Sequence, residues 1–300
     1  MENKRLSGHF AAIFTIIVWG TTFISTKVLL TVLNPVVIMF VRLLIGWMAL
    51  FIAHPQKMQG VTKKQELTFA LGGLSGITLY YFLENMALTL TMASNVGVIV
   101  SVSPMFTIIL ASIFLKSEGK MRLNFFLGFI VAMIGIGMIS FNGAKLELNP
   151  LGDFLAVGAA FVWAIYSIVT RKLGDFGYSV IQTTRRIFFY GIIFMLPSFF
   201  FFDFQLDFMK LMEPKYLFNI LYLGLCASAL CFVTWNYAVN ILGAVKTSIY
   251  IYLIPVVTII TSVLVLKEPV TWISIAGTVF AIIGLVLSEY RGKTADENEK

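Results

Sequence analysis

Long apolar stretches dominate the chain, and short groups of charged residues and turn formers separate them. A helix needs roughly 20 apolar residues to cross the hydrocarbon core of a bilayer. Runs this long and continuous are unlike the alternating ten-residue segments of a membrane barrel, and helices satisfy their own backbone groups in lipid. The pattern therefore predicts an all-α integral membrane protein with ten transmembrane helices. They cover residues 9–30, 35–54, 66–90, 94–115, 122–141, 150–171, 180–202, 215–240, 244–266 and 270–289.

Some of these boundaries are marked sharply and others are not. Asn149 and Pro150 open the sixth helix, with proline at a helix start where it is favoured. No charge occurs in residues 85–115, a run too long for one helix, so a break is predicted near 91–94. Gly243 is the expected turn between the eighth and ninth helices.

Composition supports membrane residence. Only 12% of the residues are charged and 59% are hydrophobic, whereas soluble domains carry about 25% charged residues. The first apolar stretch lacks a small-residue cleavage signature, so it is predicted to be a retained span. The net charge of +7 lies between the spans and predicts no nucleic-acid face. Cys226 and Cys231, without acidic or His neighbours, are expected to be packing residues; no metal or cofactor is predicted.

The distribution of Lys and Arg predicts the orientation. With the N-terminus in the cytoplasm, the cytoplasmic flanks and loops hold thirteen of these residues and the opposite loops hold four. This bias places both termini, residues 1–8 and 290–300, in the cytoplasm. The expected location is the cytoplasmic membrane, as a multi-pass protein.

The two halves of the chain resemble each other. An offset of 151 residues aligns Asn85 with Asn236 and Pro104 with Pro255. The repeats are predicted to be 9–141 and 150–289, each with five helices. Because five is odd, the second repeat enters the membrane from the opposite side, as in many secondary transporters that work by alternating access.

Taken together, these features resemble the drug/metabolite transporter superfamily, and its EamA-type branch in particular. The residues that carry the resemblance are Val18-Trp19-Gly20 and Val162-Trp163-Ala164, an Arg early in each second helix, and a Pro in each fourth helix. The resemblance implies a central cavity lined mainly by helices 1, 3, 4, 6, 8 and 9, with helices 5 and 10 at the periphery. The four-helix multidrug relatives use a Glu in their first helix. The first predicted helix of this chain contains no acidic residue. The proton-coupling role of that Glu therefore cannot be assigned to any residue in it.

Glu84 is the strongest candidate for chemistry, because it is the only acidic residue within the body of a predicted span. A charge in this position is costly, so it is expected to face a cavity or a partner. Arg42 and Lys27 fall in the same outer half. Two interpretations stay open: a structural ion pair of Glu84 with Arg42, and a site for a substrate amine or a proton.

Other cations within spans have simpler interpretations. Arg42 and Arg185 occupy corresponding positions in the two halves, where they can satisfy backbone carbonyls, clamp helix ends or bind substrate. Lys246 lies near the start of the ninth helix, where snorkelling to the interface explains it. With Lys27 these residues form a predicted charge network.

Polar aromatic residues deep in the spans, with two asparagines, are the remaining cavity candidates. On the third helix Tyr80 and Glu84 share a face, as do Tyr81 and Asn85; such a face suits a small zwitterion or an aromatic metabolite. Interface or core roles stay open for each aromatic. Pro104 and Pro255 are predicted gating bends. The other candidates are Trp19, Trp163, Tyr166, Trp235, Asn236, Tyr250 and Tyr252.

The predicted function is a secondary transporter that exports a small organic metabolite, either amino acid-like, an amine or an aromatic compound. A channel or a lipid flippase of the same architecture is the alternative. An intramembrane enzyme is disfavoured because no nucleophile and base occur together in the spans. The expected partners are the substrate and the bilayer, with monomer and homodimer both open.

Overall fold

The computed structural model describes residues 2–90, 93–115, 123–140, 149–200, 207–261, 264 and 271–289. Within these residues every regular element is a helix. Each of the ten predicted ranges is helical over almost all of its described residues. The side chain of Lys27 lies outside the described part of the chain.

The first half of the chain begins and ends with single long helices. Between them, the third and fourth predicted ranges are each divided into shorter helices. The elements are α1 (Glu2–Leu30), α2 (Pro35–Ala53), α3 (Lys63–Gly73), the π-helix η1 (Leu74–Leu79), α4 (Tyr80–Leu90), α5 (Ala93–Val100), α6 (Ser103–Phe114) and α7 (Leu123–Ser140).

The second half follows the same order, with three additional short elements, η2, α10 and η4. The elements are α8 (Pro150–Gly174), α9 (Val180–Met195), the 3₁₀ turn η2 (Leu196–Phe200), α10 (Phe208–Leu211), α11 (Pro214–Leu221), the π-helix η3 (Tyr222–Leu230), α12 (Cys231–Leu242), α13 (Ala244–Ile249), the 3₁₀ turn η4 (Tyr250–Leu253), α14 (Ile254–Thr261) and α15 (Trp272–Glu289).

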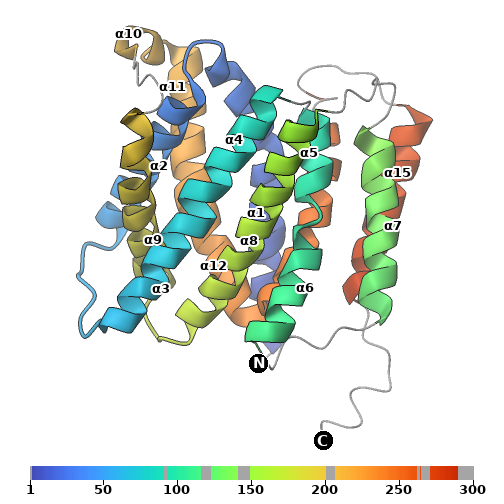
Figure 1. The fold of residues 1–300 in the computed structure, drawn as a ribbon, viewed down its shortest axis with the longest axis horizontal. Coiled ribbons are helices and arrows are strands. Elements are labelled where there is room, and N and C mark those ends of the chain that lie inside the picture. Colours follow the sequence, from blue (N-terminus) through green and yellow to red (C-terminus); the bar gives the residue numbers. More distant parts are fainter. Residues whose placement is uncertain are drawn as a thin grey trace, which may run out of the picture.

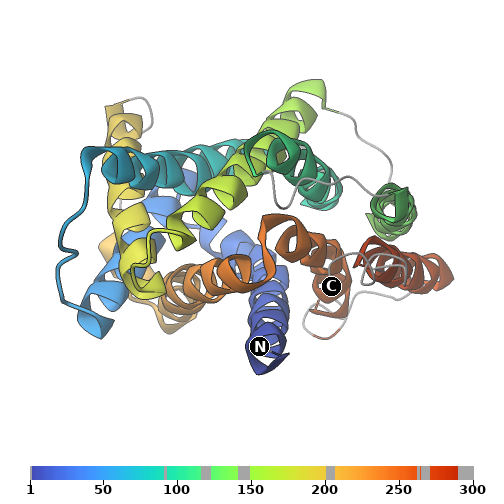
Figure 2. The ribbon, with the colours of Figure 1, turned by 90° about the horizontal axis from the view of Figure 1, so that it is seen from below.

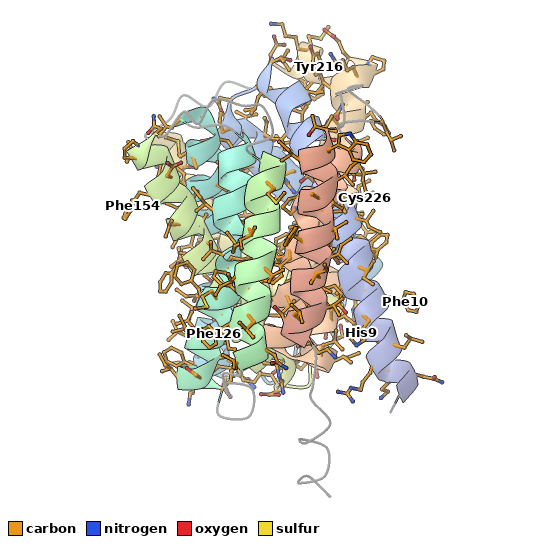
Figure 3. The ribbon with its side chains drawn as sticks, turned by 90° about the vertical axis from the view of Figure 1, so that its right-hand side faces the viewer. His9, Phe10, Phe126, Phe154, Tyr216 and Cys226 are labelled. Atoms are coloured by element: carbon orange, nitrogen blue, oxygen red, sulfur yellow. The ribbon has the colours of Figure 1, made fainter. Side chains whose placement is uncertain are left out.

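In the part of the chain that the structure describes, four helical segments are long and apolar enough to cross a membrane: Asn3–Leu30, Pro35–Ala53, Pro150–Gly174 and Pro214–Leu242. Shorter apolar helices lie beside them. Large apolar side chains cover the outside of the bundle, among them Phe10 at 63% exposure and Phe154 at 73% (Figure 3). An outer surface of this kind is suited to lipid rather than to water.

The helix starts follow local rules that can be read from the sequence. Asn34 caps α2 by accepting a hydrogen bond from the Val37 amide, and Pro35 occupies the first helical turn. Asn149 and Pro150 repeat this arrangement at the start of α8, as predicted. Such caps satisfy amides that have no partner within the helix.

The ends of the bundle are defined by the direction of the helices. The start of α1 and the end of α15 lie at the same end, and α10 lies at the opposite end (Figure 1). We call these the N-terminal end and the α10 end of the bundle.

Helices α7 and α15 form a pair at one side of the molecule, where they also contact η4 and α14 (Figure 2). Their backbones touch through small residues. A Cβ on Gly135 would lie 2.5 Å from both the Ala281 nitrogen and the Gly277 oxygen, and a Cβ on Gly284 would lie 2.4 Å from the Ala132 nitrogen. Small residues at such contacts let membrane helices approach closely. The peripheral position matches the one that the resemblance implies for the fifth and tenth helices.

Candidate functional site

A cavity opens among the helices of both halves of the chain. Its volume, measured to the centres of water molecules, is about 70 Å³, several times the roughly 10–15 Å³ that one water needs. The lining comes from α1, α2, α4, α5, α8, α12, η4 and α14. The lining residues are Trp19, Thr22, Thr26, Arg42, Tyr80, Tyr81, Glu84, Asn85, Leu88, Val100, Trp163, Phe232, Ile251 and Ile254.

One wall of the cavity is the polar face of α4. The Tyr80 hydroxyl donates a hydrogen bond of 2.8 Å to Glu84 Oε1, one turn further along the helix. Asn85 Nδ2 donates to the Tyr81 carbonyl oxygen at 2.7 Å. The face that the sequence predicted is therefore present, and all four of its residues line the cavity.

Arg42 lines the same cavity from a buried position on α2, beside the Tyr81 ring. Its Nε donates to Ser228 Oγ at 3.0 Å, and its guanidinium carbon lies 4.6 Å from the centre of the Tyr81 ring. Among the described residues, no acidic oxygen lies within 4.0 Å of the guanidinium, and its terminal nitrogens have no protein acceptor. Glu84 and Arg42 thus line one cavity without forming the direct ion pair that was one interpretation of the sequence.

Aromatic rings close the cavity toward the N-terminal end of the bundle. Trp163 lies 5.3 Å from Trp19 and 4.8 Å from Tyr80, measured between ring centres. Tyr166 lies about one turn after the lining residue Trp163 on α8, and Trp235 lies about one turn after the lining residue Phe232 on α12. Both side chains are fully buried. Trp19 donates from Nε1 to the Ala227 carbonyl oxygen at 3.0 Å.

The indole N–H of Trp163 is buried beside the cavity and has no hydrogen-bond partner among the described residues. Leaving such a donor unpaired is unfavourable. It is therefore a group that a ligand acceptor or a water molecule would satisfy.

A buried polar chain joins three helices beneath this aromatic group. The Tyr166 hydroxyl donates to Asn236 Oδ1 at 2.8 Å, and Asn236 Nδ2 donates to Thr184 Oγ1 at 3.0 Å. Asn236 therefore fixes α12 to α8 and α9 and does not line the cavity, unlike its counterpart Asn85.

The structure places the other candidates away from the cavity. Tyr250 contacts His9 near the start of α1, and Tyr252 is buried in the apolar cluster that contains Phe125 and Ala281. Lys246 in α13 and Arg185 near the start of α9 are not among the residues that line the cavity with Arg42. Lys27 cannot be placed in this set, because its side chain lies outside the described residues.

Both predicted proline bends coincide with breaks in helices. Pro104 is the second residue of α6, after a turn at Ser101 and Val102 that ends α5. Pro255 is the second residue of α14, after the 3₁₀ turn η4. Proline is tolerated at these positions because its missing N–H is not needed there.

The sequence interpretation missed four polar or aromatic contributors. Phe232 lines the cavity, and the offset of 151 that relates the repeats would have identified it as the counterpart of Tyr81. Thr22 and Thr26 follow Trp19 at helical spacing on α1, which is a second usable signal. Ser228, the partner of Arg42, has no signal of its own in the sequence.

Cys226 and Cys231 are both free thiols. Among the residues that the structure describes, no group of three His, Cys, Asp or Glu side chains is placed to hold a metal ion.

Comparison with known proteins identifies the family. The model of the EamA-like transporter family matches residues 6–141 and 150–290. An uncharacterized transporter of Archaeoglobus fulgidus is 26% identical, over 93% of this chain and 96% of its own length. A "Probable terminal-alkyne amino-acid exporter" of Streptantibioticus cattleyicolor is 24% identical, over 96% of this chain and 95% of its own. A solved structure titled "Crystal structure of protein" shares the fold with a TM-score of 0.75 at 17% identity, covering 95% of this chain and 98% of its own.

The fold and the cavity are those of a polytopic membrane transporter, and the chain belongs to the EamA-like transporter family. The resemblance seen in the sequence is thus confirmed. The family and these relatives are named as transporters rather than as enzymes, which confirms that prediction as well.

Proposed function

We propose that the protein is a secondary transporter that exports a small zwitterionic metabolite, an amino acid or a close analogue with an apolar or aromatic side chain. One observation carries the proposal: a carboxylate and a guanidinium line the same cavity without pairing with each other. An α-amino group matches Glu84, and an α-carboxylate matches the two free nitrogens of Arg42, which suit bidentate binding.

The rest of the lining fits the rest of such a molecule. Trp19, Trp163 and Phe232 present apolar ring surface, while Thr22 and Thr26 add hydroxyl groups along α1. Ligand sites commonly combine an apolar wall with a few fixed polar groups. A relative named for amino-acid export agrees with this substrate class.

The mechanism that we propose is alternating access through ten spans arranged as two inverted repeats. Two features of the backbone support it. The π-helices η1 and η3 end at Leu79 and Leu230, which are 151 positions apart, the offset that relates the repeats in the sequence. Gly73 and Gly224 are separated by the same offset.

These glycines make corresponding contacts across the two repeats. A Cβ on Gly73 would lie 2.7 Å from the Gly191 nitrogen on α9, and one on Gly224 would lie 2.6 Å from the Ile45 side chain on α2. Each third helix therefore packs against the second helix of the other repeat. Two equivalent interfaces of this kind suit a transporter that alternates between inward-facing and outward-facing conformations, because one repeat can rock against the other.

The cavity in this structure lies toward the α10 end, because α4 occupies that half of the bundle (Figure 1). The N-terminal end is held closed by contacts from α1. The Ser7 hydroxyl and the Tyr237 hydroxyl are 2.8 Å apart, and His9 contacts the Tyr250 hydroxyl. With both termini in the cytoplasm, this arrangement corresponds to an outward-facing state.

A ligand-induced thermal shift of the purified protein tests the substrate class. The panel is phenylalanine with its two halves, phenethylamine and 3-phenylpropionate, which lack the carboxylate and the amine respectively. Phenylalanine should raise the melting temperature more than either, because only it engages both charges. An equal shift with phenethylamine would instead favour an amine transporter, and no shift with phenylalanine would contradict the proposal.

A further inference from the structure

A second pocket lies outside the central cavity, between the end of α2, the start of α9 and the segment that joins α2 to α3. Its volume, measured to the centres of water molecules, is about 400 Å³, within the roughly 300–1,000 Å³ of small-molecule sites. It is lined by Trp47, Phe51, Pro55, Lys57, Met58, Arg185, Arg186 and Phe189.

The pocket contains more positive than negative charge. Arg186 is paired with Glu66, which its Nε contacts at 2.9 Å. Arg185 donates to the carbonyl oxygens of His54 and Gln56, which do not neutralise its charge. Lys57 is exposed and has no partner among the described residues. Two positive charges are thus left without a compensating acid.

The hydrogen bonds of Arg185 also fix its position. They tie the segment after α2 to the first turns of α9, and Gln182 Nε2 adds a contact to the Gln56 oxygen at 3.4 Å. The Arg185 guanidinium lies 5.5 Å from the centre of the Phe51 ring. The cation is therefore held in place before any ligand arrives, which reduces the cost of binding.

Apolar side chains border the cations on the outside of the bundle. Phe51 is 47% exposed, Ile52 75% and Phe189 39%. They belong to α2 and α9, which pack against each other, and they face the surroundings of the bundle. A ligand suited to the pocket thus has an anionic group beside the cations and apolar chains along these helices.

We propose that this pocket binds the headgroup of an anionic phospholipid at the membrane surface on the N-terminal end of the bundle. Basic pockets between transmembrane helices are suited to such headgroups. The lipid phosphate lies against Lys57 and Arg185, and its acyl chains run along Phe51, Ile52 and Phe189. The site is separate from the cavity and does not depend on the identity of the substrate.

Native mass spectrometry of the delipidated protein tests the proposal. The protein is mixed with equal amounts of phosphatidylglycerol and phosphatidylcholine that carry the same acyl chains, and the bound lipids are counted. The wild type should retain phosphatidylglycerol in preference. Lys57→Gln should weaken this retention about fivefold, since each cation near a lipid surface contributes roughly that factor. The matched control is Lys64→Gln, which removes an exposed cation at the same end of the bundle but outside the pocket.

Each other outcome contradicts the proposal. Equal retention of the two lipids by the wild type would mean that no anionic headgroup is selected. Equal losses in Lys57→Gln and Lys64→Gln would mean that only the general surface charge attracts lipid. Displacement of the retained phosphatidylglycerol by millimolar inorganic phosphate would identify a site for a soluble anion instead.

Discussion

The Tyr80 hydroxyl donates a 2.8 Å hydrogen bond to Glu84 Oε1, one helical turn away on α4, and both side chains line the central cavity. This contact leaves the second carboxylate oxygen without a protein partner among the described residues. Glu84 is therefore oriented by its own helix rather than locked to a cation on another helix.

Glu84→Gln should abolish the stabilisation by phenylalanine while leaving the melting temperature of the free protein close to that of the wild type. The amide keeps the shape and can still accept from Tyr80, but it cannot pair with an ammonium group. Tyr80→Phe is the control that keeps the charge, so it should weaken the ligand-induced shift without removing it. A large ligand-induced shift retained in Glu84→Gln would contradict the assignment of Glu84 to the substrate amine.

Arg42→Gln should not restore any stability lost in Glu84→Gln. In a direct buried ion pair, removing one partner strands the other, and removing both repairs the defect. Here the Arg42 partners are Ser228 and Tyr81, which remain in place. Melting temperatures of the two single variants and the double variant provide the test, and recovery in the double variant would show that the side chains pair directly after all.

Gly135→Ala should destabilise the protein by about 1–3 kcal/mol through overpacking against α15. The added Cβ would lie 2.5 Å from two backbone atoms there. Gly97→Ala on α5 is the matched control, because a Cβ at Gly97 meets nothing within 4 Å. Thermal or denaturant unfolding in detergent compares the two, and equal effects would rule out the tight contact between α7 and α15.

Cysteines that replace Lys64 and Lys210 should react with membrane-impermeant thiol reagents from opposite sides of the membrane. Lys64 lies at the start of α3 and Lys210 in α10, at the two ends of the bundle. The test requires a background without Cys226 and Cys231. Lys64 should react from the cytoplasm only; reaction of both positions from one side would contradict the proposed topology.

The sequence was sufficient for the helix starts that depend on local chemistry, whereas the π-helices η1 and η3 and the short helix α10 were not predicted. Asn149 and Pro150 start α8 through a cap and a favoured proline, and Pro104 and Pro255 follow helix breaks. The polar face of α4 could also be predicted, since Tyr80 and Glu84 are related by a single helical turn.

Contacts between distant helices could not be predicted in the same way. Arg42 and Arg185 correspond in the sequence, yet one is buried beside the cavity and the other holds the segment after α2. Asn85 and Asn236 likewise correspond, but Asn236 is used by Tyr166 and Thr184. What differs is the neighbouring helix that each residue meets, and a pattern along one helix does not contain that information.

We propose that the cavity lined by Glu84 and Arg42 binds a zwitterionic substrate and is exposed to each side of the membrane in turn. Counterflow measures this directly. Proteoliposomes that contain the protein are loaded with unlabelled phenylalanine and supplied with labelled phenylalanine outside, without nucleotide. The wild type should accumulate label transiently, and folded Glu84→Gln and Arg42→Gln variants should not. Absence of counterflow by the wild type, or unchanged counterflow in both variants, would contradict transport of a zwitterion through this cavity.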